Sequence, residues 1–378
     1  MRVVVAPDKF KGSLDAAGVA AALAAGVRDV IPDAVLQLVP MADGGDGTVD
    51  AFLAGGAVAR RVRVCGPLGD PVEATYARDG DVAIVEMAAA SGLALLGKQR
   101  APRRATTRGT GELVRDALDG GARRIVLGIG GSATTDGGAG ALAALGARFL
   151  DAAGVALEPR PDALSRLARV DLHGLDPRLG AVDLAIACDV DNPLLGPAGA
   201  AAVYGPQKGA APKDVAFLDG VLARLADAMA AATGRDLRDL PGAGAAGGLG
   251  WALASACGAR LERGVALVAE VRGLRRALDG ADWCFTGEGR IDAQTLRGKV
   301  VDGVAALARE ARVPVVAIGG SVDVAVEPAL RARGVRCVPI VPGPETLDRA
   351  MRDAGANLRT AAARVAAFLQ TPRNDDGG

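Results

Sequence analysis

Lysine is scarce in this chain, and most of it lies in segments rich in glycine and aspartate. Only six of the 44 basic residues are lysine. Lys9 and Lys11 lie in PDKFKGS, Lys208 lies in GPQKGA, and Lys299 lies in TGEGRIDAQTLRGK. An ammonium is a compact point charge and a guanidinium is a planar fork, so the two differ where a tight pocket holds a phosphate oxygen. The clustering indicates phosphate chemistry, although four of six could also arise by chance.

The first two unusual segments each follow a predicted strand. In PDKFKGS, Ser13 is a candidate N-cap, and a helix N-terminus beside Lys9 and Lys11 would form an anion site. In ADGGDGT, Asp43 and Asp46 stand among glycines. They either form a tight turn or place carboxylates against Mg²⁺ or a substrate hydroxyl.

The segment 128–138 holds five glycines between a predicted strand and a predicted helix. Backbone N–H groups of such a loop can bind phosphate. Its candidate binding residues are Gly130, Gly131, Ser132, Thr134 and Asp136. A GxGxxA pattern with Asp151 about 20 residues further on also fits a dinucleotide-binding loop. The polar residues that crowd the turn before the helix argue against this second interpretation.

Two further segments carry charged side chains after predicted strands. Asp189, Asp191 and Asn192 form a group typical of a hard-cation site or a general base, or else an Asx turn before proline. The second group lies in the segment 286–299 and comprises Glu288, Arg290, Asp292 and Lys299. It is not a Walker A loop, because the spacing differs and valine follows the lysine.

Composition excludes several classes of function. The chain has 44 acidic and 44 basic residues and only 3% aromatic residues, which argues against nucleic-acid and membrane partners. Five scattered cysteines without a CxxC pair argue against zinc and disulfide frameworks, and predict a cytoplasmic protein. With His173 as the single histidine, acid–base chemistry is expected to fall on carboxylates or lysine.

Short β-branched runs alternate with Ala- and Leu-rich stretches, which predicts an α/β fold with a parallel sheet. The predicted parallel strands are 2–6, 35–39, 124–129, 184–188, 283–286, 314–318 and 335–340. The predicted helices are 14–27, 111–119, 139–150, 217–232 and 300–309.

A second domain is predicted where the pattern changes. Segments 61–64, 72–77 and 82–87 read as short antiparallel strands separated by turn signals. We therefore expect a discontinuous first domain, 1–66 plus 280–378, and an inserted second domain, 67–279.

Together the five segments resemble the signature blocks of the type I glycerate kinases of bacteria, in the order of that family. The blocks are PDKFKGSLDA, PMADGGDGTVDA, GIGGSATTDGGAGAL, CDVDNPLLGPAGAAAVYGPQKGA and TGEGRIDAQTLRGK. Tyr204 stands where the family is expected to have Phe, which we interpret as a change in packing more than in chemistry. Val301 stands where proline is common.

The resemblance implies ATP-dependent phosphorylation of D-glycerate with Mg²⁺, giving 2-phosphoglycerate. It also implies two α/β domains with the active site in the cleft. One domain would be a doubly wound sheet, flavodoxin- or Rossmann-like, and the other an inserted domain with a mixed sheet. The oligomeric state stays open between monomer and homodimer.

Physical arguments suggest roles at the positions that match the family. Lys9, Lys11 and Arg290 would bind the substrate carboxylate. An aspartate would take the proton of the attacking hydroxyl, Asp189 being the first candidate and Asp43 the second. Mg²⁺ would need one or two carboxylates, for which Asp191 and Asp292 are candidates, with Glu288 a further one.

Lys208 and Lys299 would neutralise charge on the transferred group. Three alternatives stay open from the residues: a kinase that forms 3-phosphoglycerate, an NAD-dependent hydroxy-acid oxidoreductase, and a non-catalytic anion-binding module.

Overall fold

The computed structural model describes residues 1–341, 343 and 346–370 of the 378-residue chain. These residues form two compact units, and the chain passes between them several times. Unit 1 comprises Met1–Asp43, Asp50–Gly55 and the described part of Val265–Gly378, while unit 2 comprises Gly44–Val49 and Gly56–Gly264. None of the helices formed by the described residues is long and apolar enough to cross a membrane.

Unit 1 is built on a parallel sheet. Its strands are β1 (Arg2–Val5), β2 (Val35–Leu38), β11 (Trp283–Ile291), β12 (Val315–Val322) and β13 (Val335–Pro339), in the spatial order β13-β12-β11-β1-β2. Val3, Val4 and Val5 are buried, as expected for a central strand covered on both faces. The strand order reverses between β1 and β11, as in flavodoxin-like doubly wound folds. The predicted doubly wound sheet is confirmed.

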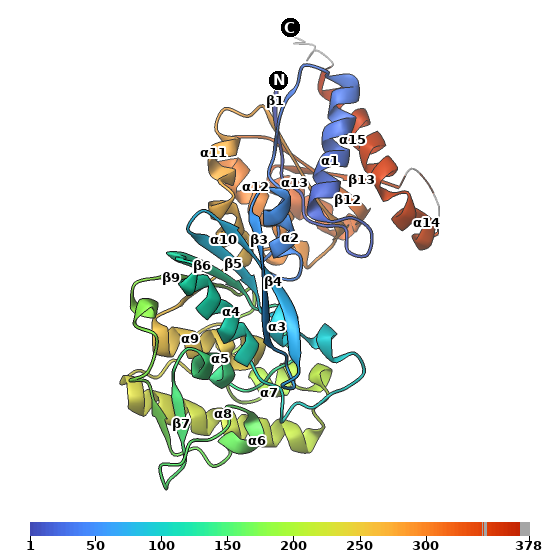
Figure 1. The fold of residues 1–378 in the computed structure, drawn as a ribbon. Helices are drawn as coiled ribbons and strands as arrows, with labels where there is room; N and C mark the ends of the chain where they lie inside the picture. Colours follow the sequence, from blue (N-terminus) through green and yellow to red (C-terminus); the bar gives the residue numbers. More distant parts are fainter. Residues whose placement is uncertain (342, 344–345, 371–378) are drawn as a thin grey trace. The chain divides into compact units, whose positions relative to one another are not determined.

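The helices of unit 1 connect its strands or follow the last of them, and each helix except Leu347–Arg352 buries apolar residues. They are α1 (Ala16–Val30), α11 (Leu274–Leu278), α12 (Val300–Glu310), α13 (Glu327–Ala332), α14 (Leu347–Arg352) and α15 (Ala354–Gln370), with 3₁₀ turns η5 (Thr295–Arg297) and η6 (Val324–Val326). Figure 1 shows α1 alongside α15. Both bury apolar residues against one core that includes Val3, Phe285 and Ile318. Because connections of parallel strands are right-handed, the reversal of strand order places α12 on the opposite face from α1.

Unit 2 is built on a mixed sheet. Its strands are β3 (Val58–Cys65), β4 (Pro71–Asp79), β5 (Val82–Glu86), β6 (Arg124–Gly128), β9 (Asp183–Ala187) and β10 (Arg260–Glu262), in the order β10-β9-β6-β5-β4-β3. The four strands from β10 to β5 are parallel, and β4 and β3 continue the sheet in antiparallel pairing. A separate antiparallel pair is formed by β7 (Arg148–Leu150) and β8 (Arg169–Asp171).

The helices of unit 2 complete its core. They are α3 (Ala88–Ser91), α4 (Arg108–Asp119), α5 (Ala139–Ala144), α6 (Pro161–Leu164), α7 (Ala200–Tyr204), α8 (Pro212–Thr233) and α9 (Leu249–Cys257), with 3₁₀ turns η1 (Leu93–Leu96), η2 (Pro177–Gly180), η3 (Pro206–Lys208) and η4 (Ala245–Gly248). Two more helices, α2 (Thr48–Ala54) and α10 (Gly264–Val271), begin in unit 2 and continue in unit 1.

Several predicted elements end at other residues than expected, and two of them show a clear physical reason. The helix predicted over 139–150 ends at Ala144, because Gly146 has φ +110° and a Cβ at that position would lie only 1.9 Å from the carbonyl oxygen of Gly174. The chain then forms β7 instead. The strand predicted over 283–286 is β11 and continues to Ile291, because β11 pairs with β12 from Cys284 to Ile291.

The unit boundaries also lie elsewhere than the sequence suggested. The strand expected to end the first domain near residue 66 is β3, which pairs with β4 throughout its length and belongs to unit 2. At the other boundary, α11 and most of α10 belong to unit 1, so the chain returns to it after Gly264 and not near residue 280.

Close packing of α1 on α15 gives a first test. A Cβ on Gly26 would lie 2.1 Å from the carbonyl oxygen of Arg359 and 2.8 Å from Cβ of Ala362. We expect Gly26→Ala to lower the free energy of unfolding by about 1–3 kcal/mol, as for other overpacked cores. The control is Gly220→Ala in α8, where a Cβ meets nothing within 4 Å and alanine should stabilise the helix by about 1 kcal/mol. Denaturant unfolding measures both, and a neutral Gly26→Ala would contradict the close packing.

Candidate active site

Carboxylates gather where the strand order of unit 1 reverses. Asp8 follows β1, and its backbone N–H donates to the carbonyl oxygen of Gly287 in β11 at 2.8 Å. Glu288 is the next residue of β11 and is buried. Asp43 follows β2 and is close enough for its charge to act on both. Ligands of doubly wound folds bind at such a reversal, outside the carboxyl ends of the strands.

Burial changes the protonation of Asp8 and Glu288. Loss of solvent, followed by the charges of Asp43 and Glu288, raises the pKa of Asp8 from 3.8 to about 7, although the Lys9 N–H bond opposes the shift. Burial likewise raises the pKa of Glu288 to about 7, while the Thr295 hydroxyl and the Lys299 charge oppose it. Carboxyl groups with such pKa values are typical of functional sites.

The connection from β11 to α12 holds Glu288 in place. The hydroxyl of Thr295 donates to Oε1 of Glu288 and accepts the N–H of Asp292 at 3.0 Å. Arg290 is exposed and lies 3.2 Å from the Asp292 carboxylate. Lys299 is the residue before α12. Unit 1 thus brings together Glu288, Asp292 and Lys299 from the predicted set.

The N-cap predicted in the first segment is wrong. Asp15, and not Ser13, is the N-cap of α1, since its carboxylate accepts the N–H of Gly18 at 2.7 Å. The Ser13 hydroxyl instead donates to the carbonyl oxygen of Met351 at 2.6 Å. Lys9 lies beside Asp8, and Lys11 is exposed.

In unit 2, the glycine-rich segment is organised around Asp136, which is 0% exposed. Oδ2 accepts the N–H of Thr107 at 2.7 Å, the hydroxyl of Thr107 at 2.8 Å and the N–H of Gly140 at 3.2 Å. Oδ1 accepts the N–H of Gly138 at 3.1 Å. Burial raises the pKa of Asp136, and these bonds oppose the shift. Its oxygens therefore bind the protein's own donors.

Most residues of the glycine-rich segment 128–138 are buried. The N–H groups of Ala133, Thr134 and Gly137 donate to Ser91 O, Ser132 Oγ and Gly247 O. Only Gly130 and Gly131 are exposed among residues 128–138. The predicted phosphate-binding backbone is thereby limited to the exposed Gly130–Gly131 edge.

The second segment packs against the carboxyl ends of the unit 2 strands. A Cβ on Gly44 would lie 2.3 Å from Cβ of Ala187 in β9. One on Gly128 would lie 2.4 Å from the carbonyl oxygen of Gly44. Val49, near the start of α2, donates its N–H to Oε1 of Glu86 at 2.7 Å. Close packing, as well as turn chemistry, therefore accounts for these glycines.

The predicted catalytic cluster after β9 is held by neighbouring residues. Asp189 accepts the N–H of Gly264 at 3.0 Å through Oδ1, at the start of α10. Arg263 donates to the carbonyl oxygen of Asp189 at 2.6 Å and forms an ion pair with Asp191 at 3.2 Å. Asp191 is exposed and Asp189 is half-buried. The Asp189 carboxylate is therefore more enclosed by the protein than the Asp191 carboxylate.

Asn192 is fixed from both ends of its amide. Tyr204 donates its hydroxyl to Oδ1 at 2.6 Å, and Nδ2 donates to the carbonyl oxygen of Ala198 at 2.8 Å. The interpretation of Tyr204 as a change in packing more than in chemistry is wrong, because the hydroxyl that Phe lacks makes this hydrogen bond.

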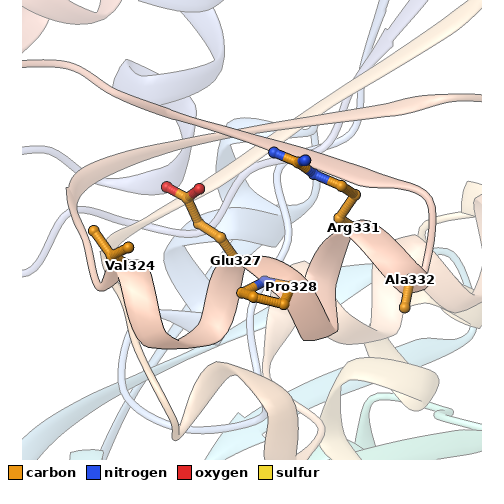
Figure 2. A pocket seen from close by; sticks show the side chains of 5 residues that line it. All are labelled: Val324, Glu327, Pro328, Arg331 and Ala332. Carbon is orange, nitrogen blue, oxygen red and sulfur yellow. The ribbon is translucent and has the colours of Figure 1, made fainter.

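A cavity of about 470 Å³ lies over η6 and α13 in unit 1 (Figure 2). Val324, Glu327, Pro328, Arg331 and Ala332 line it. None of these residues belongs to the predicted site.

Comparison with known proteins decides the family. A family model described as "Glycerate kinase family" matches residues 3–370. The chain belongs to the glycerate kinase family. The glycerate kinase of Bacillus subtilis (strain 168) is 46% identical over 376 residues, 98% of each chain. The glycerate 2-kinase of Escherichia coli (strain K12) is 44% identical over the same length, again 98% of each chain.

A solved structure has the same fold. The crystal structure of a candidate glycerate kinase 2 from Salmonella typhimurium LT2 matches with a TM-score of 0.90, at 46% identity, and covers 98% of each chain. The family resemblance and the α/β fold with one parallel and one mixed sheet are therefore confirmed.

Within this glycerate kinase family member, the metal prediction can be tested against the side chains. Among the described residues, no group of three or more His, Cys, Asp or Glu side chains is arranged to hold a metal ion. The predicted ligands Asp191 and Asp292 belong to different units, and each pairs with an arginine. Mg²⁺ usually takes one or two carboxylates and completes its shell with water and phosphate, so a partial set fits this ion.

Three residues outside the predicted set join the candidate site: Asp8, Thr295 and Arg263. Asp8 could have been found as the first ionisable residue after the first strand. Thr295 and Arg263 had no such signal, because their contacts with Glu288 and Asp191 depend on the folded turn and on β10.

The raised pKa of Asp8 predicts a pH-dependent stability. An acid whose pKa is raised on folding stabilises the protein below its ordinary pKa, and this contribution is lost as the pH rises towards about 7. Asp8→Asn keeps an acceptor for Lys9 and removes the buried charge. We expect it to raise the free energy of unfolding by a few kcal/mol more at pH 8 than at pH 5, since one pKa unit is worth about 1.4 kcal/mol.

Chemical unfolding at both pH values measures the difference. The exposed Asp33→Asn in the same unit is the control and should show no such pH dependence. Equal effects of Asp8→Asn at pH 5 and pH 8 would contradict the buried charge.

Proposed function

We propose that this chain transfers the γ-phosphoryl group of ATP to the 2-hydroxyl of D-glycerate, giving 2-phospho-D-glycerate. The observation that carries the proposal is the 44% identity, over 98% of both chains, to the protein named glycerate 2-kinase. The site agrees with it, because phosphoryl transfer depends on positioning and on charge more than on covalent chemistry of the protein. A cytoplasmic location belongs to the same proposal, supported by five cysteines with free thiols.

The binding part of the proposal rests on the cationic groups. Glycerate and ATP are both anions, so each needs positive or N–H partners. Lys9, Lys11, Arg290 and Lys299 lie in unit 1 near the strand reversal, and the exposed Gly130–Gly131 edge lies in unit 2. Lys299 also acts on the charge of Glu288. We assign these groups to the substrate carboxylate and the phosphates.

Carboxylates of unit 1 would hold Mg²⁺. Burial is the main cause that raises the pKa of Glu288, and the charges of Asp292 and Asp43 raise it further. A divalent cation would relieve this repulsion. One or two of Asp43, Glu288 and Asp292 therefore fit the ion better than Asp191, which is exposed and paired with Arg263. When bound, Mg²⁺ would neutralise charge on the phosphates.

Asp189 remains our first candidate for the base that accepts the proton of the attacking hydroxyl, and Asp43 remains the second. The carboxylate of Asp189 follows β9 and is fixed at one oxygen by the Gly264 N–H. This bond also gives Asp189 a structural role at the start of α10, because acidic side chains cap helix N-termini. The two roles can be separated by substitution.

Asn and Ala substitutions at position 189 make that separation. Asn keeps a hydrogen-bond acceptor for Gly264 but takes up no proton, whereas Ala loses both. If Asp189 is the base, Asp189→Asn lowers kcat by at least about 100-fold with little change in thermal stability, since general bases contribute about 10²–10⁴-fold. Steady-state kinetics and thermal unfolding measure the two effects. A kcat within a few-fold of the parent for Asp189→Asn would remove Asp189 as the base.

Phosphorus NMR of the product from ATP and D-glycerate tests the function itself. A 2-phosphate ester is expected. A 3-phosphate ester would replace the proposed position with the terminal hydroxyl, and no phosphorylated product would overturn the proposal.

The oxidoreductase alternative finds no support in the geometry. A dinucleotide-binding loop needs an acidic residue in the same βαβ unit to bind the ribose. Asp151 instead follows β7, which pairs with β8 apart from the main sheet, and its Oδ1 accepts the N–H groups of Ala153 and Val155.

A further inference from the structure

Lys208 is a buried lysine whose ammonium bonds to the glycine-rich segment. It ends η3 in unit 2 and is 2% exposed. Nζ donates to the carbonyl oxygen of Thr134 at 2.5 Å and to Oγ of Ser132 at 3.4 Å. Lysine is almost never buried to this extent without a partner, because its charge loses hydration. The two oxygens of one short turn supply that partner.

The turn that Lys208 holds, Ser132–Thr134, also has hydrogen bonds of its own. Oγ of Ser132 accepts the N–H of Thr134 at 3.1 Å and lies 3.1 Å from the Thr134 hydroxyl. Directly before it stand Gly130 and Gly131, the exposed edge of the segment. Gly131 has φ +70°, a conformation that other residues rarely adopt. The carbonyl oxygen of Gly131 also accepts the N–H of Leu93 at 2.8 Å, so the turn that Lys208 holds fixes this edge together with Leu93.

A second buried charge anchors the other end of the segment. Asp136 is bound by Thr107, Gly138 and Gly140, which join it to the starts of α4 and α5. The charge of Asp136 also favours the ammonium form of Lys208. Residues 132–138 are thus fixed between two buried ionisable groups, and the exposed edge projects from a rigid base.

Lys208 is poorly suited to neutralise a transferred phosphoryl group directly. Burial lowers its pKa to about 7, so part of the population is uncharged near neutral pH. An uncharged amine can still donate hydrogen bonds to Thr134 and Ser132. Holding the turn requires only these bonds, whereas neutralisation requires a lasting charge.

We propose that Lys208 is a positioning residue, which holds the Gly130–Gly131 edge through Thr134 and Ser132 so that the edge can bind an anionic group of one substrate. The proposal rests on the proposed kinase function for its kinetic consequences. It replaces the charge-neutralising role that the sequence suggested for Lys208.

The test compares Lys208→Met with Lys213→Met. Methionine keeps the length of the side chain and removes its donors, and Lys213 is an exposed lysine at the start of α8. For Lys208→Met we expect KM for either ATP or D-glycerate to rise at least about tenfold with kcat within about threefold, the signature of lost uniform binding. Lys213→Met should match the parent in both.

Hydrogen exchange gives a readout that does not depend on activity. In the unliganded full chain, Lys208→Met should speed amide exchange over residues 128–138, and Lys213→Met should not. If the parent has no kinase activity, the proposed function fails while the exchange result still tests the holding of the turn.

Two outcomes would overturn the proposal. One is a fall in kcat of about 100-fold or more at constant KM with unchanged exchange, which would mean that Lys208 acts on the transferred group. The other is no change in KM or in exchange.

If Lys208→Met does not fold, Ser132→Ala takes its place, because it removes a partner of Nζ and leaves the lysine. The same rise in KM, in smaller measure, is then expected together with faster exchange over 128–138. A change in kcat alone would contradict the proposal.

Discussion

This structure depends on stabilising ionisable groups that folding removes from water at the carboxyl ends of its parallel strands and in the segments that follow them. Asp8 and Glu288 occupy such positions in unit 1, and Asp136 and Lys208 lie in connections that follow the sheet of unit 2. A buried charge is stable only where protein dipoles or an opposite charge replace its hydration. The surrounding turns, caps and glycines are arranged to meet that requirement.

The two units surround their buried carboxylates in different ways. This difference bears on which carboxylates could interact with a ligand. Asp136 accepts hydrogen bonds from Thr107, Gly138 and Gly140, so donors of the protein itself oppose the burial that raises its pKa. Burial, and after it repulsion from neighbouring carboxylates such as Asp43, raises the pKa values of Asp8 and Glu288 to about 7. Folded proteins keep such repulsion mainly where a ligand or cation relieves it. We therefore propose that the carboxylates at the strand reversal of unit 1 take part in the chemistry, and that the buried part of the glycine-rich segment supports the exposed Gly130–Gly131 edge.

The sequence predicted the central strands well, because apolar runs such as Val3–Val5 and Leu184–Ile186 are stable only when they are buried. It also located the polar segments, since each follows a strand. It did not predict whether a polar group faces the protein or a ligand. Asp136 and Asn192 looked like binding residues, yet both are bound by protein donors. Ser13 and Asp15 are equally good caps by composition, and only the contact of Ser13 with Met351, distant in sequence, decides between them.

The structure gives a physical reason for lysine at three of the positions where it occurs. Lys208 is enclosed among hydroxyl and carbonyl oxygens, where a slender ammonium fits and can lose its proton, whereas a guanidinium is broad and stays charged. Lys9 and Lys299 lie where their charges act on Asp8 and Glu288. Lys11 is exposed, and its role is the proposed binding of a substrate anion. At these positions a point charge or a neutral donor is required, whereas arginine suits sites such as the solvated surface, where the fork of Arg359 binds both oxygens of Asp29.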